Sequence, residues 1–436
     1  MKSVSLCFVN GLCRHSGALR SAPKIGRWAT CAAAAAVAAA ALSWSLPTPA
    51  AEPVPGILLP VSFAPIVWSP TATPITTFAA TDGQYHLQYQ LLITNATSTD
   101  VVITDGDVLD PRTDEPTGNN RSLSADGVDI TLKARSFSAP RTFTSAGFGD
   151  TIPAAQSAVM YFYLTYPSVE VIPPNLKHRF TGTWTRNGMP TSFTSEDDGS
   201  TPVSTAQAVV LSPPLTGTGW LDANGSGPSV YEHRSALQPI DGALHPNQVF
   251  AIDWMKLDGQ GRLYVGDNTR NESFFGFGQK ILSATDGMVV EAIDGEPDNT
   301  PNKLPVLETN RLGGNHVYVD IGDGKYAIYN HMKRGSVAVS VGQRVRTGQL
   351  LGLLGNSGNS DAPHLHFQIS DDASSVLSTG VPYVFNRMYH QARLAVPTSP
   401  TLTDMIEKGL IPQFDTTGAG PQRLEMPLQG EVSSFQ

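Results

Sequence analysis

The sequence predicts a mostly β protein of two or three domains. Glycine and proline are abundant, with 40 and 33 residues, whereas charged residues make up only 15% of the chain. This composition favours many turns and few helices. Short segments in which polar and apolar residues alternate recur between Asp, Gly, Pro and Asn residues, which is typical of strands joined by turns. With 436 residues, the chain is too long for one average domain.

The first 51 residues have the features of an export signal. They contain no Asp or Glu, and five basic residues between Lys2 and Arg27 precede an apolar run from Cys31 to Leu46. The small residues at positions 48–51 suit cleavage by a signal peptidase. The apolar run is shorter than the roughly 20 residues that span a bilayer. We therefore expect a periplasmic or extracellular protein with no stable membrane span after cleavage.

Cleavage would also limit the chemistry of the mature protein. All three cysteines, Cys7, Cys13 and Cys31, lie in the signal, so no disulfide or thiolate metal ligand would remain. Loss of five positive charges and no negative ones takes the formal net charge from −9 to −14. A chain this acidic is not expected to bind nucleic acid through phosphate contacts.

Residues 52–211 are predicted to form a β-sandwich that serves as an accessory domain. The apolar residues Tyr85, Leu87, Tyr89 and Leu91 alternate with polar ones, as expected for a strand with one face in a core. Further strands are expected at 101–103, 128–132, 158–164 and 180–184. His86 and His178 are isolated, so we expect no metal site here.

The second half of the chain differs from this domain. Residues 212–230 are rich in Gly, Pro and Ser and are predicted to be a linker. Six of the ten histidines fall between His233 and His366. Residues 316–320 and 325–329 flank an Asp-Gly turn and predict a hairpin. Residues 373–436 show little periodicity and are predicted to be an extension over the core, with one short helix at 402–408.

The segment from Gly355 to Ile369 carries the strongest chemical signal. His364 and His366 are two residues apart, so a strand would point both imidazoles to one face and Leu365 and Phe367 to the other. Upstream lie the segments Ala251-Ile252-Asp253-Trp254, Tyr329-Asn330-His331 and 341–352. In this order, residues 231–372 resemble the lysostaphin-like (M23) family of zinc metallopeptidases, which cut peptide bonds in bacterial peptidoglycan.

This resemblance implies a fold, a cofactor and a set of site residues. The fold would be an antiparallel β-sheet peptidase domain of the duplicated hybrid or barrel-sandwich kind, over residues 231–372. Asp253 and His366 match two zinc ligands of the family. His331 and His364 match the unligated histidines that orient the attacking water and stabilise the oxyanion. His316 lies where the family has no ligand, and we expect it at the surface.

The chain departs from the family pattern at one zinc ligand. Where the family has a histidine four residues before the aspartate, this chain has Val249. If residues 241–244 close a hairpin between 232–240 and 246–254, paired residue numbers sum to about 485. His233 then lies opposite residue 252 or 253, with Cβ atoms of a pair about 5 Å apart. Some relatives carry a His-Arg pair upstream, which His233-Arg234 resembles. We favour His233 as the third ligand, with His245 or no third ligand as the alternatives.

Two functions are compatible with these residues. The first is an exported zinc metalloendopeptidase that hydrolyses peptide bonds in cell-wall peptidoglycan. The alternative is a catalytically lapsed module of the same fold, which binds peptidoglycan or regulates another wall hydrolase. Val249 favours the alternative, whereas the retention of His331, His364 and His366 favours the enzyme. The sequence identifies no protein partner.

Overall fold

The computed structural model describes residues 63–118, 132–134, 151–227, 232–395 and 400–436. The expected export signal, at residues 1–51, lies outside these ranges. Residues 62–436 form one compact unit. Among the described residues, no helix has the length and apolar character needed to cross a membrane.

The prediction of a mostly β protein is confirmed. In the described ranges the α-helices are α1 (Glu232–Ser235) and α2 (Leu402–Lys408), the second at the predicted position. Thr401 caps α2 by accepting a hydrogen bond from the Asp404 backbone N–H, and Gly409 ends the helix in the left-handed conformation. All other long elements are strands.

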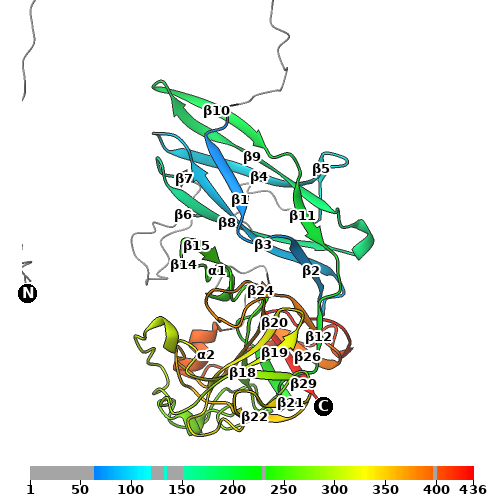
Figure 1. Cartoon of the computed structure of the whole chain (residues 1–436), viewed down its shortest axis with the longest axis vertical. Helices are drawn as coiled ribbons and strands as arrows, with labels where there is room; N and C mark the ends of the chain where they lie inside the picture. Colours follow the sequence, from blue (N-terminus) through cyan, green and yellow to red (C-terminus); the bar gives the residue numbers. More distant parts are fainter. Residues whose placement is uncertain (1–62, 119–131, 135–150, 228–231, 396–399) are drawn as a thin grey trace, which may run out of the picture. The chain divides into compact units, whose positions relative to one another are not determined.

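The N-terminal β-sandwich consists of strands packed around one apolar core (Figure 1). Strand β3 (Tyr85–Asn95) pairs with β8 (Ser157–Tyr166), and β4 (Val101–Asp110) pairs with β9 (Asn175–Arg186). The shorter strands are β1 (Ile66–Pro70), β2 (Ile75–Ala79), β5 (Glu115–Pro116), β6 (Leu132–Ala134), β7 (Thr151–Ile152), β10 (Met189–Glu196) and β11 (Thr201–Ser204). The parallel pairing of β2 with β11 joins these strands into one hydrogen-bonded sheet.

The predicted alternation along β3 is present, but both of its faces are buried. Leu87 and Leu91 point into the sandwich core. Gln88 and Gln90, on the opposite face, are only 3% and 2% exposed. His86 and His178 are buried, and each is paired with an aspartate of the same domain.

The remaining chain is organised around a second sheet, called here the main sheet, whose neighbouring strands are antiparallel. Their order is β21 (Arg344–Val345), β18 (Gly287–Ile293), β19 (Asn315–Gly322), β20 (Lys325–Met332), β23 (Leu365–Ser370), β16 (Ile252–Lys256), β13 (Gly217–Asp222), β29 (Glu431–Phe435), β26 (Met388–Leu394) and β27 (Phe414–Asp415). Short strands pair beside it: β24 (Gly380–Val381) with β23 and β28 (Gly420–Gln422) with β26. Three two-stranded pairs complete the fold: β12 (Val209–Leu211) with β25 (Tyr383–Phe385), β14 (Gln238–Ile240) with β15 (Ala243–His245), and β17 (Lys280–Leu282) with β22 (Leu350–Leu353).

The predicted hairpin is formed by β19 and β20. Its two turn residues, Asp323 and Gly324, have φ of 52° and 63°. Positive φ at both central residues is the requirement of the type I′ turn, which matches the twist of the flanking strands.

Two parts of the predicted organisation differ in the structure. The segment 212–230, expected as a linker, contains β13, which lies inside the main sheet between β16 and β29. Trp220 and Leu221 of this strand are buried, and glycines around them hid the short apolar pattern in the sequence. The segment 373–436, expected to wrap the core, supplies β26 and β29 to the same sheet.

Candidate metal centre

The register of two central strands brings Asp253 and His366 together. Asp253 of β16 pairs with His366 of β23, and paired side chains point to the same face of a sheet. Oδ1 of Asp253 lies 3.0 Å from Nδ1 of His366. The adjacent pair, Ile252 and Phe367, is completely buried on the other face. A slip of one residue would exchange these faces, so core packing fixes the register of the site.

His233 joins this pair from helix α1. Its Nε2 lies 3.2 Å from Oδ2 of Asp253, and its ring centroid lies 4.8 Å from that of His366. Ligand-type atoms of His233, Asp253 and His366 all lie within 4.8 Å of one another. The structure thus brings together the three residues that the sequence analysis selected as metal ligands.

The route by which His233 reaches Asp253 is not the expected one. The pairing of β14 with β15 is limited to three residues on each strand, and paired residue numbers sum to 483 instead of 485. Residues 232–235 are helical instead of extended, so the strand does not reach back to His233. The long hairpin is therefore a wrong prediction. His245 lies in β15 and does not belong to the group of ligand-type side chains.

Hydrogen bonds on the far side of each imidazole determine which nitrogen faces Asp253. Nδ1 of His233 lies 3.2 Å from the carbonyl oxygen of Ala251, so it donates a proton. Nε2 of His366 lies 2.8 Å from Oε1 of Gln368, so it also donates. A neutral imidazole has one N–H. Nε2 of His233 and Nδ1 of His366 therefore direct lone pairs toward the Asp253 carboxylate, an arrangement that suits a bound cation.

Each imidazole lies about as far from the Asp253 carboxylate as one zinc ligand lies from another. Zinc binds imidazole nitrogen and carboxylate oxygen at about 2.0–2.2 Å, so ligands of one tetrahedron are roughly 3.3 Å apart. Nε2 of His233 lies 3.2 Å from Oδ2 of Asp253, and Nδ1 of His366 lies 3.0 Å from Oδ1, so each imidazole approaches a different oxygen of the carboxylate. Three protein ligands leave one position for water or substrate, as hydrolytic zinc sites require.

Two supporting side chains were not predicted from the sequence. Gln368 donates through Nε2 to the carbonyl of Asn247, which turns Oε1 toward His366. Asn224 donates through Nδ2 to Oδ2 of Asp253 at 3.1 Å. Such partners fix the orientation of metal ligands. Gln368 could have been found, because it lies two residues after His366 on the same strand face. Asn224 comes from the segment interpreted as a linker, so no local pattern revealed it.

His331 and His364 lie beside this group, with ring centroids 4.7 Å apart. Nε2 of His364 is 3.4 Å from Oδ1 of Asp253, and the His331 ring centroid is 5.8 Å from that of His366. Nδ1 of His364 faces the Ala362 carbonyl oxygen, and Nδ1 of His331 faces that of Ser357, both at 2.8 Å. Nε2 of His331 is therefore the ring nitrogen that the Ser357 bond leaves for substrate or water, whereas Nε2 of His364 faces the Asp253 carboxylate.

An uncommon backbone conformation directs the His331 ring. Its φ is 63°, in the left-handed region that few non-glycine residues adopt. Asn330 pairs with His366, so in a regular strand the next side chain would point to the core face. Backbone hydrogen bonds from His331 N–H to Gly313 and from Gly355 N–H to the His331 carbonyl hold the turn. Strain of this kind persists where the surroundings enforce it, often at functional sites.

The segment around Ser357, which orients the His331 ring, packs tightly against Gly314, just before β19. Gly314 has φ of 62°, and a Cβ there would lie 2.4 Å from the backbone carbon of Ser357. Ser357 accepts from Nδ1 of His331 and donates through Oγ to the Met332 carbonyl at 2.7 Å. Glycine at 314 thus permits the close approach that fixes the ring of His331.

Burial and neighbouring charges shift the protonation of these groups. Burial opposes the charge of Asp253, but without a bound cation the protonated rings of His233 and His364 hold the pKa of its carboxyl well below the usual range. Burial alone would lower the pKa of His364, yet the Asp253 carboxylate raises it to about 9. Burial, followed by the charges of His364 and His366, lowers the pKa of His331 well below its usual value.

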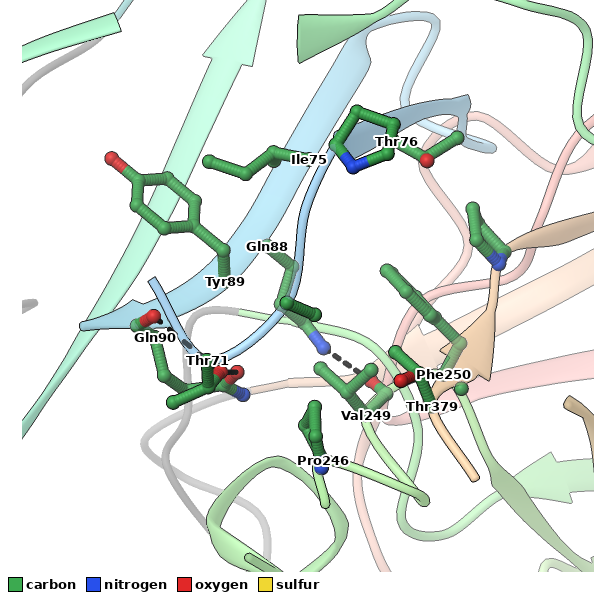
Figure 2. Close-up of a pocket in the computed structure, with 14 residues that line it drawn as sticks. Thr71, Ile75, Thr76, Gln88, Tyr89, Gln90, Pro246, Val249, Phe250 and Thr379 are labelled. Carbon is green, nitrogen blue, oxygen red and sulfur yellow. Dashed lines mark hydrogen bonds between the residues drawn. The ribbon is translucent and has the colours of Figure 1, made fainter. Parts of the chain in front are cut away.

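The structure places two other residues differently from the simplest expectation. His316 is 4% exposed, not at the surface as predicted; its Nε2 lies 3.0 Å from Glu291, and its ring stacks on Tyr318. Val249, where the family has a ligand, is buried in the apolar core of the main sheet. Its carbonyl oxygen accepts a hydrogen bond from Nε2 of Gln88 (Figure 2).

Comparison with known proteins agrees with this geometry. Residues 274–377 match the family model of Peptidase family M23, and this match includes His331, His364 and His366. The chain contains an M23 peptidase domain. Asp253 and His233 lie upstream of the matched residues, on strand β16 and helix α1 of the same compact unit.

Several relatives share this M23 region. Glycyl-glycine endopeptidase ALE-1 of Staphylococcus capitis is 33% identical over 114 residues, covering 25% of this chain and 27% of that protein. Lysostaphin of Staphylococcus simulans is 27% identical over 177 residues, covering 37% of this chain and 33% of that protein. The chain thus spans about a third or less of the curated relatives it matches. The solved catalytic domain of Staphylococcus simulans lysostaphin is 22% identical with a TM-score of 0.22, covering 37% of this chain and 88% of that one.

Proposed function

We propose that this protein is an exported, zinc-dependent metalloendopeptidase that hydrolyses peptide bonds in bacterial peptidoglycan. The observation that carries the proposal is the convergence of two imidazole lone pairs and one carboxylate, from His233, His366 and Asp253. The names of two relatives of the M23 domain support the substrate class: one is a glycyl-glycine endopeptidase and another a peptidoglycan DD-endopeptidase. Export is supported by the sequence of residues 1–51.

The proposed roles of the side chains follow from their positions. Asp253, His366 and His233 would hold zinc, which when bound polarises a scissile carbonyl and makes water more acidic. His331, kept neutral by burial and by its histidine neighbours, accepts a proton from the attacking water through Nε2. His364, whose pKa is raised by Asp253, donates through Nε2 to the oxygen on which charge develops.

Metal content and hydrolysis measured on the same samples test this function. The purified chain should retain about one zinc per molecule after dialysis and release free amino groups from purified peptidoglycan. His366→Ala should lose both zinc and activity, and His233→Ala should lose most of the zinc. His245→Ala is the matched control, because His245 lies outside the group, and should behave as wild type. Wild-type protein without zinc above background would rule the proposal out.

The lapsed-module alternative keeps one specific observation in its favour. Val249 removes a ligand that the family pattern has at this position, and it is buried where it cannot bind a metal. That alternative predicts a chain that sediments with peptidoglycan but releases no amino groups from it, whether or not zinc is added. The same experiment therefore separates the two functions.

A further inference from the structure

The helix that carries His233 is packed on the N-terminal β-sandwich. Leu237, two residues after α1, is 1% exposed and packs against Val159 and Tyr161 of β8. The guanidinium of Arg234, inside α1, lies over the ring of Tyr163 at 5.4 Å from its centroid. A candidate ligand of the M23 site is thus held by side chains of a different domain.

Gln90 of β3 binds the backbone of the same helix. Its Nε2 donates to the carbonyl oxygen of Arg234 at 3.2 Å. Its Oε1 accepts from the hydroxyl of Thr71 at 3.1 Å, a bond drawn in Figure 2. Because the Arg234 carbonyl can only accept, the NH2 end of the Gln90 amide must face it, and Oε1 is then turned toward the Thr71 hydroxyl, which donates to it.

Gln88 forms hydrogen bonds with two backbone segments, one before α1, which carries His233, and one before β16, which carries Asp253. Its Oε1 accepts from the backbone N–H of Gly227, before α1, at 3.3 Å. Its Nε2 donates to the carbonyl of Val249, before β16, as Figure 2 shows. Gln88 and Gln90 are two residues apart, so they share the face of β3 opposite the sandwich core. Both are buried, and neither contacts the ligand-type atoms themselves.

We propose that Gln88 and Gln90 are positioning residues for the third metal ligand, so that the N-terminal β-sandwich is part of the metal-binding apparatus of the M23 domain. This inference rests on the proposed function, because it requires that His233 binds zinc. In the family pattern the corresponding histidine lies four residues before the aspartate. Here Val249 occupies that position, and the polar face of β3 holds the segment from which His233 is supplied instead.

The physical basis is the cost of ordering a ligand. His233 lies on a single helical turn, and a helix this short is not stable by itself. If its anchors are removed, part of the zinc-binding free energy must be spent on ordering α1. Side chains that orient metal ligands without touching the metal typically change affinity by about 10–100-fold when mutated. We expect an effect in this range for Gln90.

The test is a double-mutant cycle on zinc affinity in the full chain. Zinc dissociation constants are measured by competition with a chelator for wild type, Gln90→Leu, His233→Ala and the double variant. Leucine keeps the volume of the side chain and removes its hydrogen bonds. Gln90→Leu should weaken zinc binding by ~10-fold or more in the wild-type background, and by less than about twofold when His233 is absent. Gln88→Leu should behave in the same way.

A control separates positioning from general stability. Ile93→Val removes one methylene from the sandwich core on the opposite face of β3, so it should lower the melting temperature without changing zinc affinity. If Gln90→Leu changes only the melting temperature, or weakens zinc equally with and without His233, the proposal is wrong. It is also wrong if His233→Ala binds zinc as wild type does, a result that leaves the proposed peptidase function intact. Failure of the proposed peptidase function would be seen separately, as wild-type protein that contains no zinc or does not hydrolyse peptidoglycan.

Discussion

Asp253 and His366 lie directly opposite each other on β16 and β23, with Oδ1 of the first 3.0 Å from Nδ1 of the second. Strand spacing and core packing set this separation. The position of His233, by contrast, depends on a four-residue helix held from outside the main sheet. The candidate centre therefore combines two ligands fixed by the sheet with one whose position other contacts determine.

Replacement of His331 or His364 by Ala should separate catalysis from metal binding. Each ring lies beside the centre with Nδ1 bound to a backbone carbonyl, and in the proposed mechanism neither holds zinc. We expect turnover to fall by ~10²–10⁴ for a lost proton-transfer group and ~10²–10³ for a lost oxyanion donor. Zinc content should remain near the wild-type value in both variants. A His364→Ala protein as empty of zinc as His366→Ala would show that His364 is itself a ligand.

Restoring the family histidine should not rescue the site. Val249 is buried among apolar residues, and its Cγ1 is 3.0 Å from where a Cβ on Gly380 would lie. Val249→His would bury an imidazole without a partner and overpack this region, at a cost of about 1–3 kcal/mol each. We expect the double variant His233→Ala with Val249→His to bind zinc no better than His233→Ala alone. Recovery of wild-type zinc content would mean that residue 249 can reach the centre.

Asp222 should make the protein less stable as pH rises. It is completely buried on β13, and neither of its carboxylate oxygens has a hydrogen-bond partner among the described residues. Burial, then the charges of Glu431 and Asp253, raise the pKa of this carboxyl well above the usual value. The folded state therefore keeps a proton that the unfolded state loses above about pH 4, and the free energy of unfolding falls as pH increases through this range.

Asp222→Asn removes that proton linkage. Relative to wild type, its unfolding free energy in urea should be higher at pH 8, and this advantage should shrink as the pH is lowered toward 4. The matched control is Asp241→Asn, because Asp241 is exposed at the turn between β14 and β15 and asparagine also tolerates the positive φ of this position. If the difference between Asp222→Asn and wild type is the same at every pH, Asp222 is ionised in the folded protein and our account of it is wrong.

Gly314→Ala should loosen the segment around Ser357. Alanine would need a left-handed backbone and would place its Cβ 2.4 Å from Ser357, so the segment must shift. We expect a loss of about 1–3 kcal/mol in unfolding free energy and a fall in turnover, because Ser357 orients His331. Gly324→Ala is a suitable comparison, since it has a similar φ but no atom near the added Cβ; it should lower stability without selective loss of turnover.

The sequence predicted those features that depend on local periodicity. The alternation around His366 and around Leu87 placed the correct residues in the two cores, because a period of two directly describes a strand. The Asp323-Gly324 turn and the helix at 402–408 were predicted from local preferences of the backbone. One of the two reasons for selecting His233 was mistaken, because the ladder of the hairpin stops at Gln238 and does not reach residue 233. The other reason, the resemblance of His233-Arg234 to a His-Arg pair in some relatives, does not depend on the hairpin.

Features that depend on distant contacts were not accessible in this way. The sequence pattern predicts that Gln88 and Gln90 face solvent, whereas both are buried and hydrogen-bonded to the backbone of Gly227, Arg234 and Val249. Strand β13 was hidden among glycines, and only its pairing with β16 and β29 makes it a strand. When another domain buries the polar face of a strand, the strand keeps its ordinary alternation of polar and apolar residues, so this burial cannot be recognised from one sequence.

The position of β13 has a consequence for the order in which this protein folds. It pairs on one side with β16, which carries Asp253, and on the other with β29, where Leu221 meets Val432. Closing the loop between Leu221 and Val432 is slow, because the chain loses conformational entropy before the strand contacts stabilise the pair. The sheet beneath Asp253 is therefore completed late, after local hairpins such as β19 and β20. A metal ion would then bind a nearly finished fold instead of guiding its early steps.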